Sequence, residues 1–317
     1  MSGPVTDSDV GGDETTPMPT TPSTPQLEIT ESHLADVAGL SVRRALPRRA
    51  RRTIGAWCFL DHMGPTTVNE EHRIDIGPHP HMGLQTVTWL VSGELVHRDS
   101  LGSEQLIQPG QLNLMTAGNG VTHAEESTGT FRGDQQGVQL WIAQPESTRN
   151  GPAAFEHHAT LPTFEVANGT ATVLVGTLGD ATSPARRDTD HVGVDLALVA
   201  GTAVLPVFPS YEYGLVVLEG ELQIDGEHVT PGHLAYLGLG RDELSFTLDA
   251  PARAILIGGV PFDEDVLMWW NFVARTRDEV TAAYLDWRDE TARFGDTASS
   301  LTRIPARPPL WLREPTA

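Results

Sequence analysis

The sequence contains no lysine, and its basic residues are few. All 21 of them are arginine, and they stand against 42 aspartates and glutamates, which gives a formal net charge of −21. A surface with this charge repels the phosphates of nucleic acids and of anionic lipid headgroups. The composition therefore argues against direct nucleic-acid binding and against binding to an anionic membrane.

Cysteine and long apolar runs are equally scarce. Cys58 is the only cysteine, so no intramolecular disulfide can form, which is typical of proteins in a reducing compartment. No apolar run approaches the ~20 residues that span a bilayer. The first residues also lack the basic and apolar regions of a secretory signal. We therefore expect a cytoplasmic protein that does not enter a membrane.

Aromatic residues make up only 6% of the chain, whereas 31 glycines and 23 prolines supply many turns. This balance favours short β-strands over long helices. Residues 1–26 are mainly Thr, Pro, Ser, Gly and Asp with almost nothing to bury, so we expect a disordered tail there. Beyond it, stretches such as residues 86–91 and 138–142 are rich in strand-forming residues and end at turns. This pattern predicts an antiparallel sandwich or barrel.

The two halves of the chain share a pattern of domain length. Residues 89–95 and 217–222 both contain an apolar strand, then Gly-Glu, then the start of a second strand. Each is followed by a Pro-Gly turn, at residues 109–110 and 231–232. This internal repeat predicts two β domains that are built alike.

We assign residues 27–148 to the first domain and residues 149–262 to the second. The pattern changes after them, and four apolar residues recur at helical spacing: Val280, Ala283, Tyr284 and Trp287. This spacing predicts an amphipathic helix within residues 276–291. Residues 263–317 are expected to form that helix and an extended tail, both packed on the barrels.

Two short motifs carry residues that bind metals. His79 and His81 flank Pro80, and His123 stands two residues before Glu125. Alternate residues of a strand point to the same face, with Cα atoms ~6.5–7 Å apart, so each pair can approach one ion. Either motif alone is weak, because a single His-x-His is more often a chance pair in a loop and a single Glu is usually a solvated carboxylate. Together, on two facing strands, they predict one site with four ligands.

Three imidazoles and one carboxylate form a mixed nitrogen and oxygen donor set. Such a set suits Fe(II), Mn(II), Co(II), Ni(II) or Zn(II) and is too rich in nitrogen for Ca²⁺ or Mg²⁺. An octahedral ion would keep two positions open for water, substrate or O₂. The turn Gly118-Asn119-Gly120 just before His123 indicates a close backbone approach or unusual dihedral angles.

The remaining histidines have more ordinary interpretations. We expect His62 to make a structural hydrogen bond, and His97 to pair structurally with its charged neighbours. Support of a metal ligand is the less favoured alternative for His97. His157 and His158 are expected in an exposed link between the domains.

The stretch from Trp57 to Trp141 resembles the pirin family of the cupin superfamily. The matching segments are FLDHMGP (59–65), HPHMG (79–83), QTVTWL (85–90), HRDSLG (97–102), PGQ (109–111), MTAGNGVTHAE (115–125) and VQLW (138–141). GVPF (259–262) and NFV (271–273) also match, so the resemblance covers nearly everything after the tail.

The resemblance implies an all-β bicupin, with two jelly-roll-like cupin barrels in tandem and a C-terminal helix. It implies one iron ion in the first barrel, held by His79, His81, His123 and Glu125. The second barrel is expected to lack a metal, and the sequence agrees, because no His-x-His occurs there and His228 and His233 have no His-x-Glu partner. One position departs from the family, which has Glu where this chain has Gln85. A neutral amide cannot act as a base, so Gln85 is limited to hydrogen bonding.

Several pirin-like proteins resemble quercetin 2,3-dioxygenases, which cleave the flavonol ring with O₂ and release carbon monoxide. The resemblance therefore implies a small aromatic, flavonol-like substrate, with Glu125 as the catalytic base for its hydroxyl. It also implies an alternative, in which a non-catalytic, iron-dependent redox sensor binds a metabolic enzyme or a transcription-related protein. A third alternative is a vestigial metal with a purely structural role.

Overall fold

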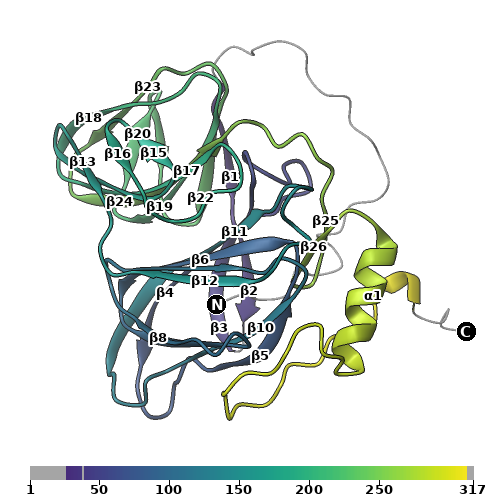
Figure 1. Ribbon diagram of the computed structural model, residues 1–317. Coiled ribbons are helices and arrows are strands. Elements are labelled where there is room, and N and C mark those ends of the chain that lie inside the picture. The colour runs from purple at the N-terminus through teal and green to yellow at the C-terminus, as the bar shows by residue number, and fades with distance from the viewer. Residues whose placement is uncertain (1–25, 38, 313–317) are drawn as a thin grey trace, which may run out of the picture.

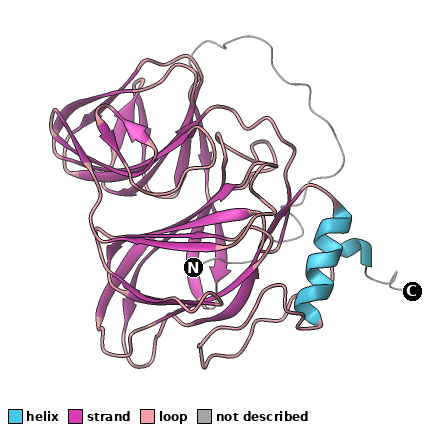
Figure 2. Cartoon of the chain, viewed as in Figure 1, coloured by secondary structure: helices cyan, strands magenta, loops and turns pink. Residues whose placement is uncertain are grey.

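The computed structural model describes residues 26–37 and 39–312, so the tail expected over residues 1–26 lies outside the described residues except for Gln26. The described chain forms two β-barrels in tandem, followed by one α-helix at the side of the first barrel (Figures 1 and 2). The predicted all-β bicupin with a C-terminal helix is thus confirmed. No helix in the described part of the chain is both long enough and apolar enough to cross a membrane.

The first barrel consists of a four-stranded and a seven-stranded antiparallel sheet. The smaller sheet runs in the order β5 (Ile76–His81), β10 (Val121–Glu126), β7 (Leu95–Asp99) and β8 (Glu104–Ile107). The larger sheet runs in the order β12 (Ala154–His158), β9 (Leu112–Thr116), β6 (Leu84–Ser92), β11 (Gly133–Ala143), β4 (Trp57–Val68), β3 (Leu40–Leu46) and β2 (His33–Val37). A cluster that includes Met63 and Leu90 of the larger sheet and Leu95 of the smaller one joins them.

The second barrel repeats this plan. Its seven-stranded sheet runs in the order β1 (Glu28–Glu31), β22 (His233–Gly238), β19 (Glu212–Glu219), β24 (Ala252–Gly259), β17 (His191–Leu198), β14 (Gly169–Val175) and β13 (Thr163–Val166). Its four-stranded sheet runs in the order β18 (Gly201–Pro206), β23 (Glu243–Leu248), β20 (Leu222–Ile224) and β21 (Glu227–Val229). Two small hairpins complete the strands, β15 (Thr177–Leu178) with β16 (Ala181–Thr182) and β25 (Leu267–Trp269) with β26 (Phe272–Ala274).

The first described strand of the chain belongs to the second barrel. β1 precedes the first barrel in sequence but pairs with β22 of the second, with Glu28 opposite Tyr236. β12 follows β11 along the chain and pairs with β9 of the first barrel, with Phe155 opposite Met115. The N-terminal end of the described chain thus belongs to the second barrel, and β12 completes the larger sheet of the first barrel.

The two seven-stranded sheets also pack against each other. Trp89 and Leu140 of the first sheet share one buried apolar cluster with Val216 and Ile255 of the second. Because one face of each sheet lines its own barrel and the other face meets the neighbouring barrel, these strands bury consecutive residues. β6, for example, is buried without interruption from Leu84 to Leu90.

Trp57, at the start of β4, makes side-chain hydrogen bonds to the second barrel. Its indole Nε1 donates to the carbonyl oxygens of Val192 at 3.1 Å and Gly258 at 3.2 Å. Only glycine suits position 193, because a Cβ there would lie 2.8 Å from the indole ring. The side chain is completely buried.

We expect Trp57→Phe to lower the free energy of unfolding by ~1–3 kcal/mol, because it removes a buried donor shared by two carbonyl groups. Equilibrium unfolding in denaturant measures this loss. The matched control is Trp89→Phe, since Trp89 is equally buried but its indole N–H has no partner among the described residues. An equal loss in both variants would contradict the role given to the Trp57 hydrogen bonds.

The C-terminal segment covers the side of the first barrel. Helix α1 (Arg277–Arg288) begins at the N-cap Thr276, whose side chain accepts from the N–H of Glu279. The four apolar residues that predicted the helix are all buried. They pack in one cluster with Met82, which follows β5, and with Phe272 of β26. The helix thus rests beside the strand that carries the first histidine pair.

Candidate metal centre

Three of the four predicted ligands meet inside the first barrel. His79 and His81 of β5 and His123 of β10 each place a ring nitrogen within 4.8 Å of those of the other two. Their ring centroids are 4.4–5.1 Å apart, and all three side chains are buried. The antiparallel register sets His123 directly opposite His79. Strand alternation then brings His81 to the same face.

The local sequence explains why this strand pair can carry the site. β5 is the edge strand of its sheet, where Pro80 can replace a residue without removing a ladder hydrogen bond. The C-terminal segment covers this strand, since the N–H of Ile304 donates to the carbonyl oxygen of Pro78 at 2.9 Å. A Cβ at Gly77 would lie 2.1 Å from the carbonyl oxygen of Thr302, so only glycine permits this approach.

The turn before β10 shows the close approach that its glycines predicted. Gly118 has φ +52°, and a Cβ there would lie 2.2 Å from the carbonyl oxygen of Gly151. The neighbouring N–H of Asn119 donates to the same oxygen at 3.0 Å. This turn holds the start of β10, and with it His123, against the loop after β11.

The protonation of the three imidazoles suits a metal. Burial lowers the pKa of His79 to about 4, and the pKa values of His81 and His123 lie well below the usual range because of burial and the neighbouring histidines. All three rings are therefore neutral near pH 7, which is the form that binds metals. The Nδ1 of His79 donates to the carbonyl oxygen of Gly77 at 2.8 Å, which leaves the lone pair on Nε2. The donor set thus fits a divalent transition metal.

Glu125 lies two residues beyond His123 on β10 and is 2% exposed. The pairing of β10 with β5 shifts between these two residues, so that Glu125 stands opposite Ile76. Its carboxylate is not part of the group of three nitrogens. The structure therefore brings the three histidines together, and Glu125 is a buried carboxylate on the same strand.

His97 contacts the site more directly than its sequence suggests. Its Nδ1 lies 3.3 Å from the Nδ1 of His123, and its Nε2 lies 3.1 Å from the Oδ2 of Asp99. The pairing with Asp99 is the structural contact that we expected. The contact with His123 comes from the register of β7 against β10, which places His97 opposite Glu125. The only sequence signal for it is the alternation of His97 and Asp99 along one strand.

The other singled-out residues lie outside the histidine group. The Nε2 of His62 lies 3.3 Å from the Nε2 of Gln136, and Gln85 is fully buried and donates to Thr116 at 3.0 Å. The expectation that His157 and His158 lie in an exposed link was wrong, because both residues are half-buried in strand β12. His157 there contacts the side chain of Asn113 at 2.8 Å.

The larger sheet contributes an aromatic and polar wall. Phe59 stacks on Trp141 with ring centroids 4.0 Å apart, and the rings of Trp141 and His81 are nearly perpendicular, with centroids 5.3 Å apart. The guanidinium of Arg44 lies 4.6 Å from the centre of the Phe59 ring and forms a bidentate ion pair with Asp61. Phe59, Asp61 and Trp141 lie in segments that carry the family resemblance, but no pattern in the sequence predicts the pairing of Arg44 with Asp61.

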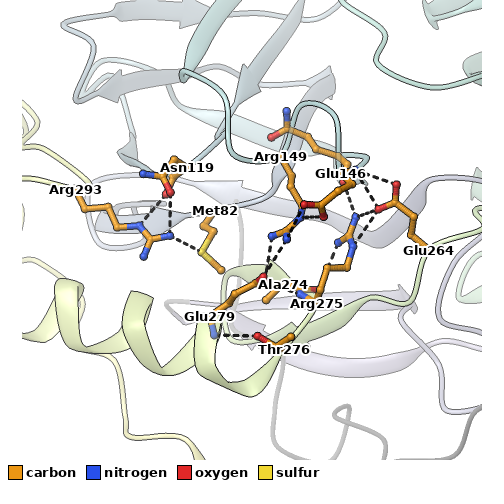
Figure 3. Close-up of polar contacts among 11 residues, drawn as sticks. Met82, Asn119, Glu146, Arg149, Glu264, Ala274, Arg275, Thr276, Glu279 and Arg293 are labelled. Carbon is orange, nitrogen blue, oxygen red and sulfur yellow. Dashed lines mark hydrogen bonds and ion pairs between the residues drawn. The ribbon is translucent and has the colours of Figure 1, made fainter.

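Polar contacts join the C-terminal segment to residues of the first half of the chain (Figure 3). Arg293 donates to the carbonyl oxygen of Asn119 at 2.8 Å and to the sulfur of Met82 at 3.0 Å. On the other side, Arg149 binds the Glu279 carboxylate at 2.9 and 3.1 Å. The turn before β10 and the end of β5 are therefore both held by residues that follow the second barrel.

Comparisons with known proteins agree with this architecture. Residues 39–142 match the family model described as Pirin, and residues 193–295 match the one described as Pirin C-terminal cupin domain. A Pseudomonas aeruginosa protein with the name "Putative quercetin 2,3-dioxygenase PA1205" is 48% identical over 258 residues, which cover 81% of this chain and 82% of that protein.

Two solved structures show the same fold. The crystal structure of a quercetin 2,3-dioxygenase from Acinetobacter baumannii is 41% identical, with a TM-score of 0.87, and the match covers 90% of this chain and 97% of that one. The nickel(II) complex of an Escherichia coli pirin is 16% identical, with a TM-score of 0.60, and the match covers 74% of this chain and 100% of that one. The second likeness concerns the fold alone. Both halves of the chain match the family's own models, and the histidine cluster lies in the first of them, so this chain belongs to the pirin family.

Proposed function

We propose that this chain holds one divalent metal, with iron(II) as the first choice, through His79, His81, His123 and Glu125. We further propose that it acts as a quercetin 2,3-dioxygenase on a flavonol-like substrate. The observation that carries the proposal is the convergence of three buried, neutral imidazoles beside an aromatic wall. The names of the Pseudomonas and Acinetobacter relatives support the choice of reaction.

When bound, a redox-active divalent ion supplies a Lewis acid for the substrate hydroxyl and the electronic coupling that dioxygen chemistry requires. The protein's own residues supply proton transfer and the surroundings of the site. We assign to Glu125 the role of accepting the proton of the flavonol hydroxyl, because it is a buried carboxylate two residues from His123. Phe59 and Trp141 are both fully buried and form an apolar wall beside His81, which would keep bulk water away from the histidine cluster.

The donor set also accepts manganese, cobalt, nickel or zinc. Zinc would fill the site without supporting dioxygen chemistry, because it has no accessible redox change. The metal and the reaction are therefore tested separately. Elemental analysis of protein purified without oxygen identifies the metal, and loading with iron(II) prepares the protein for the assay.

We expect iron-loaded protein to bleach the visible absorbance of quercetin in air and to release carbon monoxide. The metal-free protein and the Glu125→Ala variant are the controls, since the first lacks the ion and the second lacks the proposed base. Equal absorbance loss in all three samples would contradict the proposal. Stoichiometric iron binding without turnover would instead favour the redox-sensing regulator, which would then be sought by pull-down of a protein partner in the presence and absence of iron.

A further inference from the structure

We propose that His97 and Asp99 act as positioning residues that hold His123 in the one tautomer able to bind the metal. The three side chains form a continuous chain of contacts that runs from a turn at the barrel surface to the histidine cluster. The inference deepens the proposed metal centre and rests on it, but it does not depend on which substrate that centre serves.

The Asp99 carboxylate is fixed by the backbone. Its Oδ1 accepts from the N–H groups of Leu101 and Ser103, both at 2.9 Å, and the N–H of Asp99 itself donates to the carbonyl oxygen of Ser103 at 3.1 Å. The side chain has no exposed surface. Its second oxygen, Oδ2, is thereby aimed at the Nε2 of His97 at 3.1 Å. A carboxylate can only accept, so the proton on this contact belongs to His97 Nε2.

The proton on Nε2 determines whether the other ring nitrogen of His97, Nδ1, donates or accepts a hydrogen bond. A neutral imidazole with its proton on Nε2 carries a lone pair on Nδ1. That lone pair faces the Nδ1 of His123 at 3.3 Å, so His123 must supply the hydrogen there. With Nδ1 protonated, the lone pair of His123 is on Nε2, which is then the metal-binding nitrogen. The opposite tautomer would place a proton on Nε2 and prevent ligation.

The His97 ring is also held in its plane. Phe155 of β12 stacks on it, with ring centroids 4.4 Å apart and planes 14° from parallel. The contact crosses the barrel, because β12 belongs to the larger sheet and β7 to the smaller. The ring therefore cannot turn to break its contacts with Asp99 and His123 without losing this stacking.

Asp99→Asn tests the proposal with almost no change in shape. The backbone N–H groups of Leu101 and Ser103 fix the amide oxygen at the Oδ1 position, so the amide nitrogen takes the place of Oδ2. It then donates to Nε2 of His97, which moves the His97 proton to Nδ1 and the His123 proton to Nε2. We expect affinity for Co(II) and Zn(II), measured by chelator competition, to fall about 10–100-fold. Nitrogen-15 spectra of labelled histidine should show both rings in the opposite tautomers.

Two further variants separate positioning from folding. Asp195→Asn changes an equally buried carboxylate, paired with Arg253 in the second barrel, and should keep the metal affinity. His97→Phe keeps a ring for Phe155 but removes the acceptor for His123, and should weaken binding as Asp99→Asn does. His97→Asn restores an acceptor oxygen and should recover much of the affinity.

Asp99→Asn protein with unchanged affinity and unchanged tautomers would overturn the positioning role alone. If the protein without any substitution binds neither Co(II) nor Zn(II) at one ion per chain, both the metal centre and the positioning role are overturned. The two failures are therefore distinguishable, and neither requires turnover of a flavonol.

Discussion

His123→Ala should abolish stoichiometric metal binding and leave both barrels folded. The change removes one of three converging imidazoles. It should weaken binding by more than about 100-fold, because changes in residues that merely support a ligand already cost about 10–100-fold. Elemental analysis after metal loading and desalting measures the bound ion, and far-ultraviolet circular dichroism checks the fold.

The matched control is His191→Ala. His191 is also fully buried, but it lies on β17 in the second barrel, where its ring meets Trp57 at 5.4 Å. This variant should keep one metal per chain. Glu125→Gln belongs in the same series, because a reduced but measurable affinity would support a carboxylate ligand beside the histidines. One bound metal ion per chain in the His123→Ala protein would show that His123 is not a metal ligand.

Arg44→Met should destabilise the protein by ~3–5 kcal/mol, which is the usual effect of breaking a buried ion pair from one side. The Nε and Nη2 atoms of Arg44 each donate to one oxygen of Asp61 at 2.8 Å, and both side chains are 1% exposed or less. Removal of the guanidinium leaves a buried carboxylate without its counterion. Equilibrium unfolding in urea, followed by tryptophan fluorescence, gives the change in free energy.

Two further variants test whether the lost ion pair is the cause. Arg44→Met combined with Asp61→Leu removes both charges and should recover most of the lost stability, because a well-packed apolar pair can replace a buried ion pair. Arg132→Met breaks an exposed pair with Glu70 and should leave the free energy of unfolding almost unchanged. If the single and the double variant at positions 44 and 61 were equally unstable, lost packing rather than the unpaired charge would be the cause.

The helix and the histidine cluster could be predicted from the sequence, because each depends on the spacing of residues that are close together in the chain. The helix followed from the spacing of Val280 and Trp287, and its N-cap Thr276 is the first residue of the predicted range. The histidine cluster followed from strand alternation in two short motifs. Its position in the first barrel followed from the resemblance to pirins.

Long-range pairing could not be predicted in the same way. Arg44 and Asp61 form no motif, and only the register of β3 against β4 sets them opposite each other. The contact between His97 and His123 likewise depends on how β7 pairs with β10. The packing of one large sheet against the other could not be predicted either. Their strands, such as residues 86–91, read as runs of apolar and β-branched residues, and such a run does not show what covers each of its faces.

The exchange of β1 between the barrels affects how the protein folds during synthesis. Domains commonly fold from the N-terminus as the ribosome releases them. β1 is the first described strand to emerge, yet its partner β22 follows roughly 200 residues later, so this strand must wait while the first barrel forms beside it. Until then, the nascent chain carries a strand without its partner, which is a site for incorrect association. Completion of the second barrel gives β1 its partner β22 and removes that exposed edge, so the later half of the chain protects the strand that emerges before it.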